Sequence, residues 1–93
     1  MIYELEFLEE ALAEWHRLDG SIKAQFKKKL TERLVAPRLP TAKLAGHPDR
    51  YKIKLRSVGY RLVYEVHDDR LVVLIVALGR RDKNAVYKAA AGR

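Results

Sequence analysis

The sequence predicts an α+β fold in which two N-terminal helices pack on one face of a small, twisted, mostly antiparallel β-sheet, followed by a short C-terminal helix. Two features of the sequence support this prediction. Before Pro37, apolar residues recur mainly at the three- and four-residue spacing of amphipathic helices. Between Tyr51 and Leu78 they alternate or run continuously, as in strands. Because a chain of 93 residues builds one hydrophobic core, we expect a single domain over residues 1–93.

Three elements are expected before Pro37. Residues 2–7 alternate between apolar and acidic side chains and predict a first strand. Residues 8–18 carry apolar side chains at helical spacing and predict a first helix. Ser21 is the expected N-cap of a second helix, which ends before Pro37 because proline lacks a backbone donor. The buried stripe of this second helix is expected to contain Ile22, Phe26, Leu30 and Leu34.

A β-hairpin is predicted over residues 51–64, YKIKLRSVGYRLVY. Apolar side chains alternate with mostly polar ones on both sides of a break at Ser57-Val58-Gly59, which is the pattern of two half-buried strands. With Val58-Gly59 as a two-residue turn, Leu55 pairs with Leu62 and the apolar faces of the two strands coincide.

The opposite face of this hairpin carries a cluster of cations. The same register places Arg56 across from Arg61, with Lys54 nearby, and it places Lys52 across from Glu65. Opposed like charges mildly destabilise a sheet, so a polyanionic ligand would explain the cluster. The alternative is an ordinary solvated face on which Lys52 pairs with Glu65 and the other cations point into water.

The chain after the hairpin predicts a central strand and a last helix. Residues 71–78, LVVLIVAL, are apolar on both faces, as expected for a strand in the middle of a sheet. Gly79 lets the chain bend away, and Asp82 is the expected cap of a short helix that carries Tyr87. The sheet face opposite the two N-terminal helices is expected to be open and to present Lys52, Lys54 and Arg61.

The basic charge is concentrated outside the N-terminal segment. The formal net charge is +7, from 19 bases and 12 acids. Residues 1–19 hold six acids and one base, which leaves 18 bases and six acids in the rest of the chain. Such a localised excess is typical of nucleic-acid binding. Part of this basic excess lies on the outer face of the second helix, at Lys23, Lys27, Lys28 and Arg33. This face is either a solubilising surface or an arm that contacts structured RNA.

Several chemistries are disfavoured by what the sequence lacks. It contains no cysteine, which excludes a disulfide framework, a thiolate zinc site and a cysteine nucleophile. The three histidines fall in separate predicted elements, and there is no phosphate-binding glycine loop or calcium loop. We therefore expect no metal and no other cofactor. Neither a signal peptide nor a membrane-spanning run is apparent, so we expect a cytoplasmic protein without membrane contacts.

The remaining chemistry belongs to cationic side chains. RNA cleavage by attack of a 2′-hydroxyl on the adjacent phosphorus requires neutralised charge, a deprotonated attacking oxygen and a protonated leaving oxygen. Arginine binds phosphate in a bidentate manner, whereas a lysine crowded by like charges lowers its pKa and can be partly neutral. A nearby aromatic side chain either stacks on a base or packs within the fold. The candidate residues are Lys52, Lys54, Arg56, Arg61, Arg80, Arg81 and Tyr87.

The sequence resembles the RelE toxins of bacterial toxin-antitoxin systems over nearly its whole length. The resemblance rests on residues 51–64, on Gly-Arg-Arg at 79–81 followed by Val-Tyr at 86–87, and on ALAEW at 11–15 and KKKL at 27–30. It implies a RelE-like fold and a ribosome-dependent endoribonuclease, an mRNA interferase that cuts mRNA in the ribosomal A site. It also implies inhibition by a RelB-type antitoxin, and contact with operator DNA only through the toxin-antitoxin complex.

The resemblance also implies roles for individual residues. Arg61 and Arg81 would hold the scissile phosphate and stabilise its transition state. Lys52 and Lys54 would supply charge and proton transfer, and Tyr87 would position or stack a base. The identity of the general base stays open. Further RNA contacts are expected at Lys23, Lys27, Lys28, Arg56 and Arg80.

Two functions of other classes remain as alternatives. One is a ParE-like gyrase inhibitor, a non-nuclease toxin of the same superfamily that shares the fold but lacks the basic catalytic set. The other is a non-catalytic RNA-binding module. Substitution of Arg81 or Lys54 separates them, because only the nuclease would lose messenger cleavage.

Overall fold

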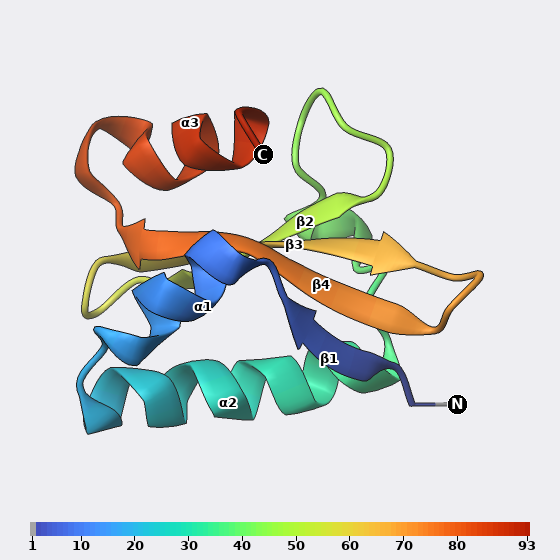
Figure 1. Ribbon diagram of the computed structural model, residues 1–93, viewed down its shortest axis with the longest axis horizontal. Coiled ribbons are helices and arrows are strands. Elements are labelled where there is room, and N and C mark those ends of the chain that lie inside the picture. The colour runs from blue at the N-terminus through green and yellow to red at the C-terminus, as the bar shows by residue number, and fades with distance from the viewer. Residues whose placement is uncertain (1) are drawn as a thin grey trace.

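The computed structural model describes residues 2–93 (Figure 1). Its strands are β1 (Glu4–Phe7), β2 (Arg50–Leu55), β3 (Tyr60–His67) and β4 (Val72–Arg80). They form one sheet in the order β1-β4-β3-β2, in which β1 lies parallel to β4 and the other neighbours are antiparallel. This arrangement confirms the predicted α+β class, and it confirms that the most apolar strand lies inside the sheet.

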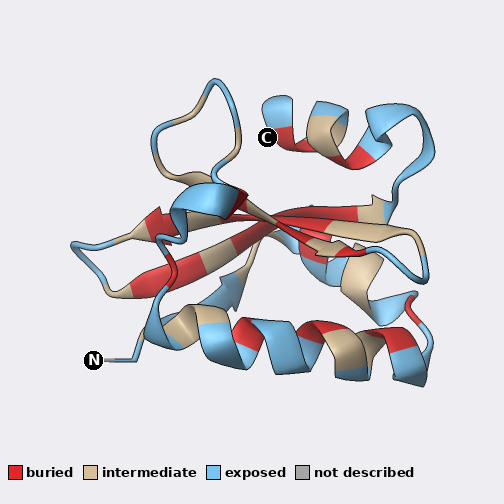
Figure 2. Ribbon diagram, turned by 180° about the vertical axis from the view of Figure 1, so that it is seen from behind, coloured by how far each residue is buried: buried red, intermediate tan, exposed pale blue. Residues whose placement is uncertain are grey.

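Helices lie on both sides of this sheet (Figures 1 and 2). They are α1 (Glu9–His16), α2 (Gly20–Val35) and α3 (Ala85–Ala91), with short 3-10 turns η1 (Pro40–Ala42) and η2 (Asp82–Asn84). α2 packs on one face through buried Ile22, Phe26 and Leu30. α3 packs on the other face through Val86 and Ala90. The expectation of an open face is therefore wrong over β3 and β4, because the apolar side of α3 is buried there.

A bulge in β4 explains how this strand is apolar on both faces. Val76 is an extra residue in β4 relative to its partner β3, which is the definition of a β-bulge. The bulge reverses the alternation of side chains along the strand. Ile75 and Leu78 consequently join the apolar cluster beneath α2, whereas Val76 and Ala77 join the cluster beneath α3.

α1 covers the edge of β4 beyond the end of β1. There the Glu14 carboxylate accepts a hydrogen bond from the backbone nitrogen of Leu78 (3.2 Å) and two from the Arg93 guanidinium (2.8 and 3.1 Å). Arg93 also donates to the carbonyl oxygen of Val76 (3.0 Å). A strand edge otherwise leaves such backbone groups unpaired. Glu14 and Arg93 thus complete the sheet edge and attach the end of α3 to α1.

We expect Glu14→Ala to lower the free energy of unfolding by about 2 kcal/mol, because it removes the acceptor of a backbone N–H and of a guanidinium. The Glu14 side chain is only 22% exposed, so water replaces these bonds incompletely. Urea denaturation at neutral pH measures the change. Glu32→Ala, at an exposed position of α2, is the matched control and should have little effect. Equal midpoints for the two variants would show that the Glu14 contacts contribute nothing.

The N-terminus of α2 is capped by Asp19, so the prediction of Ser21 as the cap is wrong. The Asp19 carboxylate accepts hydrogen bonds from the backbone nitrogen of Ile22 and from the Ser21 hydroxyl, both at 3.0 Å. These bonds, first that from Ile22, hold the pKa of Asp19 below its ordinary value. An ionised carboxylate is favoured at this position because it faces the positive end of the helix dipole.

The connection from β4 to α3 also differs from the prediction. Neither η2 nor α3 has a side-chain cap, so the expected cap at Asp82 is not formed. Instead, Lys83 and Asn84 both adopt left-handed backbone conformations, with φ of 48° and 59°. This tight reversal sends α3 back over the sheet, and nothing in the residue pattern of the helix itself signals it.

The β2–β3 hairpin has a longer turn than predicted. Leu55 pairs with Tyr60 rather than Leu62, which leaves residues 56–59 as a four-residue turn. The turn closes through a hydrogen bond from the Gly59 nitrogen to the Leu55 carbonyl oxygen (2.9 Å), with Gly59 at a φ of 70°. Because the pairing shifts by two residues, every side chain keeps its predicted face.

The corrected register separates Lys52 from Glu65. Lys52 lies across from Val63, and Glu65 lies across from Arg50. The Glu65 carboxylate accepts a hydrogen bond from Nε of Arg50 (2.9 Å) and lies 2.7 Å from Nε2 of His67. The predicted cross-strand pairing of Lys52 with Glu65 is therefore wrong, and with it the alternative in which that carboxylate neutralises the lysine.

Candidate nucleic-acid interface

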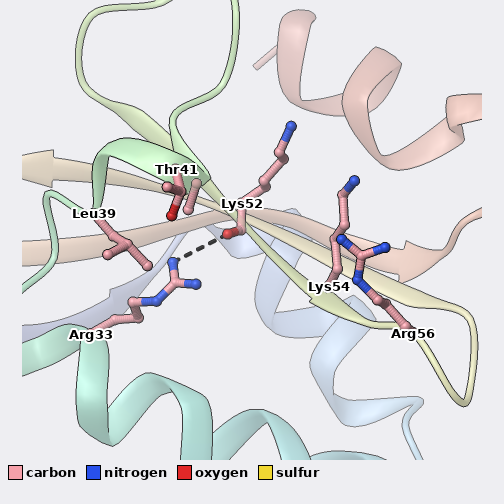
Figure 3. A pocket seen from close by; sticks show the side chains of 7 residues that line it. Arg33, Leu39, Thr41, Lys52, Lys54 and Arg56 are labelled. Carbon is pink, nitrogen blue, oxygen red and sulfur yellow. Dashed lines mark hydrogen bonds between the residues drawn. The ribbon is translucent and has the colours of Figure 1, made fainter.

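β2 is an edge strand, and its lysines point to the side of the sheet on which α3 lies (Figure 3). Lys54 lies across from Arg61, and Lys52 lies across from Val63, which in turn lies across from Ala77. Residues in one cross-strand row share a face, and Val63 and Ala77 pack beneath α3. Lys52, Lys54 and Arg61 consequently share that face. The two lysines are half-buried beside α3 rather than covered by it.

Lys54 is crowded by other cations. Its pKa lies below the ordinary value for lysine, chiefly because of the charge on Lys52, and further because of desolvation and of the charges on Arg56 and Arg61. Every charged neighbour that shifts it is a cation. The direction of the shift is the one expected for a lysine among cations, and it favours the neutral amine more than in an isolated lysine.

Arg81 is held against the β2–β3 turn. Its backbone nitrogen donates to the carbonyl oxygen of Gly59 (2.9 Å), and its side chain lies next to Gly59, where a Cβ atom would be in ordinary contact with Nε at 3.7 Å. The positive φ of Gly59 is what favours glycine at this position. Nη1 of Arg61 donates to the carbonyl oxygen of Tyr60 (2.9 Å), at the same end of the hairpin. The turn that carries Arg56 thus also positions Arg81.

Tyr87 lies toward the opposite end of β2. Together with Arg50 and the 44–47 loop it lines a cavity of about 270 Å³. Its hydroxyl is buried, and within residues 2–93 it has no hydrogen-bond partner. Arg50 precedes Lys52 by two residues on β2. The candidate residues therefore follow β2 from Tyr87 at one end, past the two lysines, to Arg81 at the other.

Arg80 does not join these residues. It belongs to a cross-strand row with Tyr60 and Leu55, both of which belong to the cluster beneath α2. Its guanidinium lies over the Tyr60 ring, 5.8 Å from the ring centroid. The sheet thus separates Arg80 from Lys54, and an RNA contact at Arg80 stays a prediction.

The lysines of α2 lie in a different layer from those of β2. Lys27 and Lys28 are exposed and Lys23 is half-buried, on a helix that packs against the sheet face opposite α3. They are not brought together with Lys52 and Lys54. Only a partner large enough to contact both sides of the molecule would reach both groups.

Arg33, which the sequence places on the outer face of α2, points inward instead. Nη1 of Arg33 donates to the backbone oxygen of Lys52 (3.1 Å) and to the hydroxyl of Tyr64 (2.9 Å). The sequence contained a signal for this orientation, because Arg33 follows Leu30 by three residues and Phe26 by seven. Those spacings place it on the buried side of a helix.

The histidines and carboxylates do not gather into a metal site. Within residues 2–93, no group of three or more His, Cys, Asp or Glu side chains is placed to hold a metal ion. His47 and His67 instead lie on either side of Glu65, with nitrogen–oxygen distances of 3.6 and 2.7 Å.

Among the described residues, 2–93, no helix combines the length and the apolar character required to span a membrane.

Comparison with known proteins gives consistent matches. The model of the family described as ParE toxin of type II toxin-antitoxin system, parDE, matches residues 5–85. The mRNA interferase toxin RelE of Escherichia coli strain K12 is 50% identical over 93 residues, which cover 100% of this chain and 98% of that protein. The mRNA interferase RelE of Shigella flexneri matches with the same identity and coverage.

Solved structures confirm the fold. A free form of E. coli toxin RelE with two arginines replaced by alanine has a TM-score of 0.91 and 49% identity, with 100% of this chain and 98% of that chain covered. The same variant in complex with an antitoxin RelBc peptide has a TM-score of 0.85 and 50% identity, with 97% and 95% covered. The order of helices and strands inferred from the sequence is thus that of a solved toxin fold.

Proposed function

Because this chain belongs to the ParE toxin family of type II toxin-antitoxin systems and is 50% identical to RelE, we propose that it is a ribosome-dependent endoribonuclease of the cytoplasm. It acts as an mRNA interferase that cleaves mRNA in the ribosomal A site and thereby inhibits translation. The observation that carries this proposal is the group of cations along β2, with Lys54 at its centre and no carboxylate among the charges that shift its pKa.

The proposed reaction is attack of a ribose 2′-oxygen on the adjacent phosphorus. The bond from phosphorus to the 5′-oxygen breaks, and that oxygen takes up a proton from solvent, which leaves a 2′,3′-cyclic phosphate and a 5′-hydroxyl. Arg61 and Arg81 bind the non-bridging oxygens, where negative charge increases in the transition state. Lys54 accepts the proton of the 2′-hydroxyl, since its pKa is lowered. Cationic side chains thus provide the charge that a metal ion supplies in other nucleases.

Two further residues complete the proposed site. Lys52 adds positive charge beside Lys54 and is the main cause of its lowered pKa. Tyr87 lines a cavity next to β2, where an aromatic ring can stack on a base of the mRNA. Stacking on Tyr87 holds in place the nucleotide on which the reaction occurs. The Tyr87 hydroxyl, which lacks a hydrogen-bond partner within residues 2–93, can strengthen this by a hydrogen bond to the same nucleotide.

Dependence on the ribosome follows from the composition of this site. A set of lysines and arginines is a poor acid-base catalyst without accurate placement of the RNA, and a ribosome that holds the mRNA supplies that placement. Lys23, Lys27 and Lys28 on α2 then contact ribosomal RNA, on the side of the molecule away from the messenger. Charge neutralisation makes such contacts sensitive to salt.

We also propose that a RelB-type antitoxin binds this chain, and that operator DNA is contacted only through their complex. An apolar groove of about 340 Å³ between β1 and α2 offers one binding surface, with Leu5, Phe7, Trp15 and Leu34 among its lining residues. The exposed edge of β1 adjoins it. An acidic, amphipathic antitoxin segment suits both this groove and the cations of β2. Copurification with the antitoxin and inhibition of cleavage by it are the expected results.

The decisive experiment maps the 5′ ends of a messenger incubated with programmed ribosomes and this protein. New 5′ ends should appear at the A-site codon, and they should be absent when the ribosomes or the protein are omitted. Equal cleavage of naked mRNA would contradict the dependence on ribosomes. A complete lack of cleavage, together with inhibition of DNA gyrase in a supercoiling assay, would instead favour a ParE-like gyrase inhibitor.

A further inference from the structure

A cavity lies beside the outer edge of β2 (Figure 3). Lys43, just after η1, bridges to Tyr51 at the start of β2, and beyond that point no further strand pairs with this edge within residues 2–93. The cavity occupies about 290 Å³ between the edge, η1 and the end of α2, and none of its lining residues is acidic. Its polar side chains are Arg33, Thr41, Lys52, Lys54 and Arg56.

Arg33 is fixed at the wall of this cavity. Its Nη1 atom donates to the Lys52 backbone oxygen and to the Tyr64 hydroxyl, and that hydroxyl itself donates to the carbonyl oxygen of Pro37 (2.6 Å). Tyr64 is fully buried, so this side of the guanidinium is anchored to the core. Arg33 therefore extends from α2 across to β2 in one defined position.

The charge of Arg33 has no counterion among the described residues. Both of its hydrogen bonds go to neutral oxygen atoms, although the residue is half-buried. By contrast, Arg38, Arg50, Arg70 and Arg93 each form an ion pair with a carboxylate. A half-buried charge usually has a partner, because removal from water is costly. Arg33 and its three cationic neighbours thus line one cavity to which no carboxylate contributes.

We propose that this cavity binds a second phosphate of the mRNA, adjacent to the scissile one, and that Arg33 is its anchor. The inference rests on the proposed function, because it assigns the neighbouring phosphate of the same substrate. The Arg33 guanidinium lies over the Tyr64 ring, 5.7 Å from its centroid, but among the described residues its hydrogen bonds use only Nη1, so Nη2 and Nε can donate to a phosphate. The Thr41 hydroxyl offers a further donor at the same cavity.

The position of the lysines connects this cavity to the proposed catalytic residues. Lys52 and Lys54 line the cavity, and they also lie on the sheet face of Arg61. Side chains two residues apart on a strand are about 7 Å apart, which is the scale of the separation between consecutive phosphates in extended single-stranded RNA. The strand edge can thus hold two neighbouring phosphates, one toward Arg61 and the other toward Arg33.

The inference is tested with a fluorescein-labelled RNA hexamer that carries 2′-O-methyl groups, so that it cannot be cleaved, and with versions in which one phosphate at a time is replaced by a neutral methylphosphonate. Binding is measured by fluorescence anisotropy at several salt concentrations. For the unmodified protein, neutralisation of either of two consecutive phosphates should weaken binding by roughly tenfold. A single sensitive phosphate would overturn the inference without any variant being made.

Arg33→Gln should weaken binding of the unmodified hexamer by roughly tenfold and lower the salt dependence by about one phosphate contact. It should also abolish the sensitivity to one of the two methylphosphonates while the other persists. Arg33→Lys keeps the charge and should retain that sensitivity in reduced form. Arg17→Gln removes the same charge from an exposed site at the end of α1 and should keep both sensitivities. An Arg33→Gln profile identical to that of Arg17→Gln would show that Arg33 only attaches α2 to β2.

This outcome is distinguishable from failure of the proposed function. If the protein cleaves mRNA on ribosomes but the phosphate profile of Arg33→Gln matches that of the unmodified protein, only the second phosphate site is wrong. If the protein does not cleave at all, the proposed function fails whatever the hexamer shows. Thermal unfolding of Arg33→Gln and Arg33→Lys establishes that both variants are folded before their binding is compared.

Discussion

Arg81→Ala is expected to lower the rate of mRNA cleavage on programmed ribosomes by at least about 100-fold, the effect of removing one preorganised donor from a developing negative charge. The loss should appear in the rate at saturating protein rather than in binding to the ribosome, because the interaction strengthens as charge builds on the phosphate. Single-turnover cleavage assays and ribosome sedimentation measure the two quantities separately. Expression of the variant in bacteria should no longer arrest growth.

Arg80→Ala is the matched comparison, because it removes the same side chain from the preceding position. The guanidinium of Arg80 lies over Tyr60 on the α2 side of the sheet, so its loss should reduce the rate only a few-fold. Arg81→Lys should recover part of the activity, since it restores the charge but not the bidentate geometry. Equal losses for Arg80→Ala and Arg81→Ala would mean that the rate depends on total charge and not on the position of Arg81.

The fold was largely predictable from the spacing of apolar residues. Continuous apolar character over residues 71–78 correctly indicated the inner strand, and alternation over residues 51–64 gave the faces of the hairpin. The face covered by α3 was not predictable, because the two positive φ angles at Lys83 and Asn84 that redirect the chain have no glycine to signal them. The pairing of Leu55 was missed for a related reason, since turns of two and four residues both fit one break in the pattern.

The candidate site was predictable where it depends on alternation along one strand. Lys52 and Lys54 share a face with Arg61 in any register that keeps the apolar faces together. The inward direction of Arg33 was missed because charged residues on helices are usually assigned to the outer face. The partner of Glu65 was also misassigned, because the choice between Lys52 and Arg50 depends on the exact register. Local pattern thus determines faces, and tertiary contacts determine partners.

Lys54→Met is expected to stabilise the protein at neutral pH while it removes activity. The lowered pKa of Lys54 means that its charged form is disfavoured in the folded state, chiefly by the charge on Lys52. Below the folded pKa this destabilisation is fully present, and it disappears as the pH rises past the ordinary lysine pKa of about 10.4. The variant should therefore have a higher melting temperature than the unmodified protein at neutral pH, and the difference should vanish at strongly alkaline pH.

A matched variant tests whether the gain comes from crowding. Lys29→Met removes a lysine from an exposed position of α2, away from Lys52 and Lys54, so its effect on the melting temperature at neutral pH should be smaller and should depend less on pH. Stabilities that are identical for Lys54→Met and Lys29→Met across the pH range would contradict the role assigned to crowding.

The same crowding predicts how the cleavage rate depends on pH. If neutral Lys54 accepts the proton from the 2′-hydroxyl, Lys54→Met should lower the rate by about 100-fold or more, and the rate of the unmodified protein should rise with pH up to the lowered pKa of Lys54. Lys52→Met removes the main cause of that lowering, so the pKa of Lys54 should increase and the pH–rate profile should move toward alkaline pH. Single-turnover rates on ribosomes across neutral and alkaline pH measure this shift. If Lys54 is the base, the pH–rate profile must follow the pKa of Lys54, which Lys52 lowers. A profile that Lys52→Met leaves in place, or moves toward acid pH, would therefore contradict the assignment of Lys54 as the base.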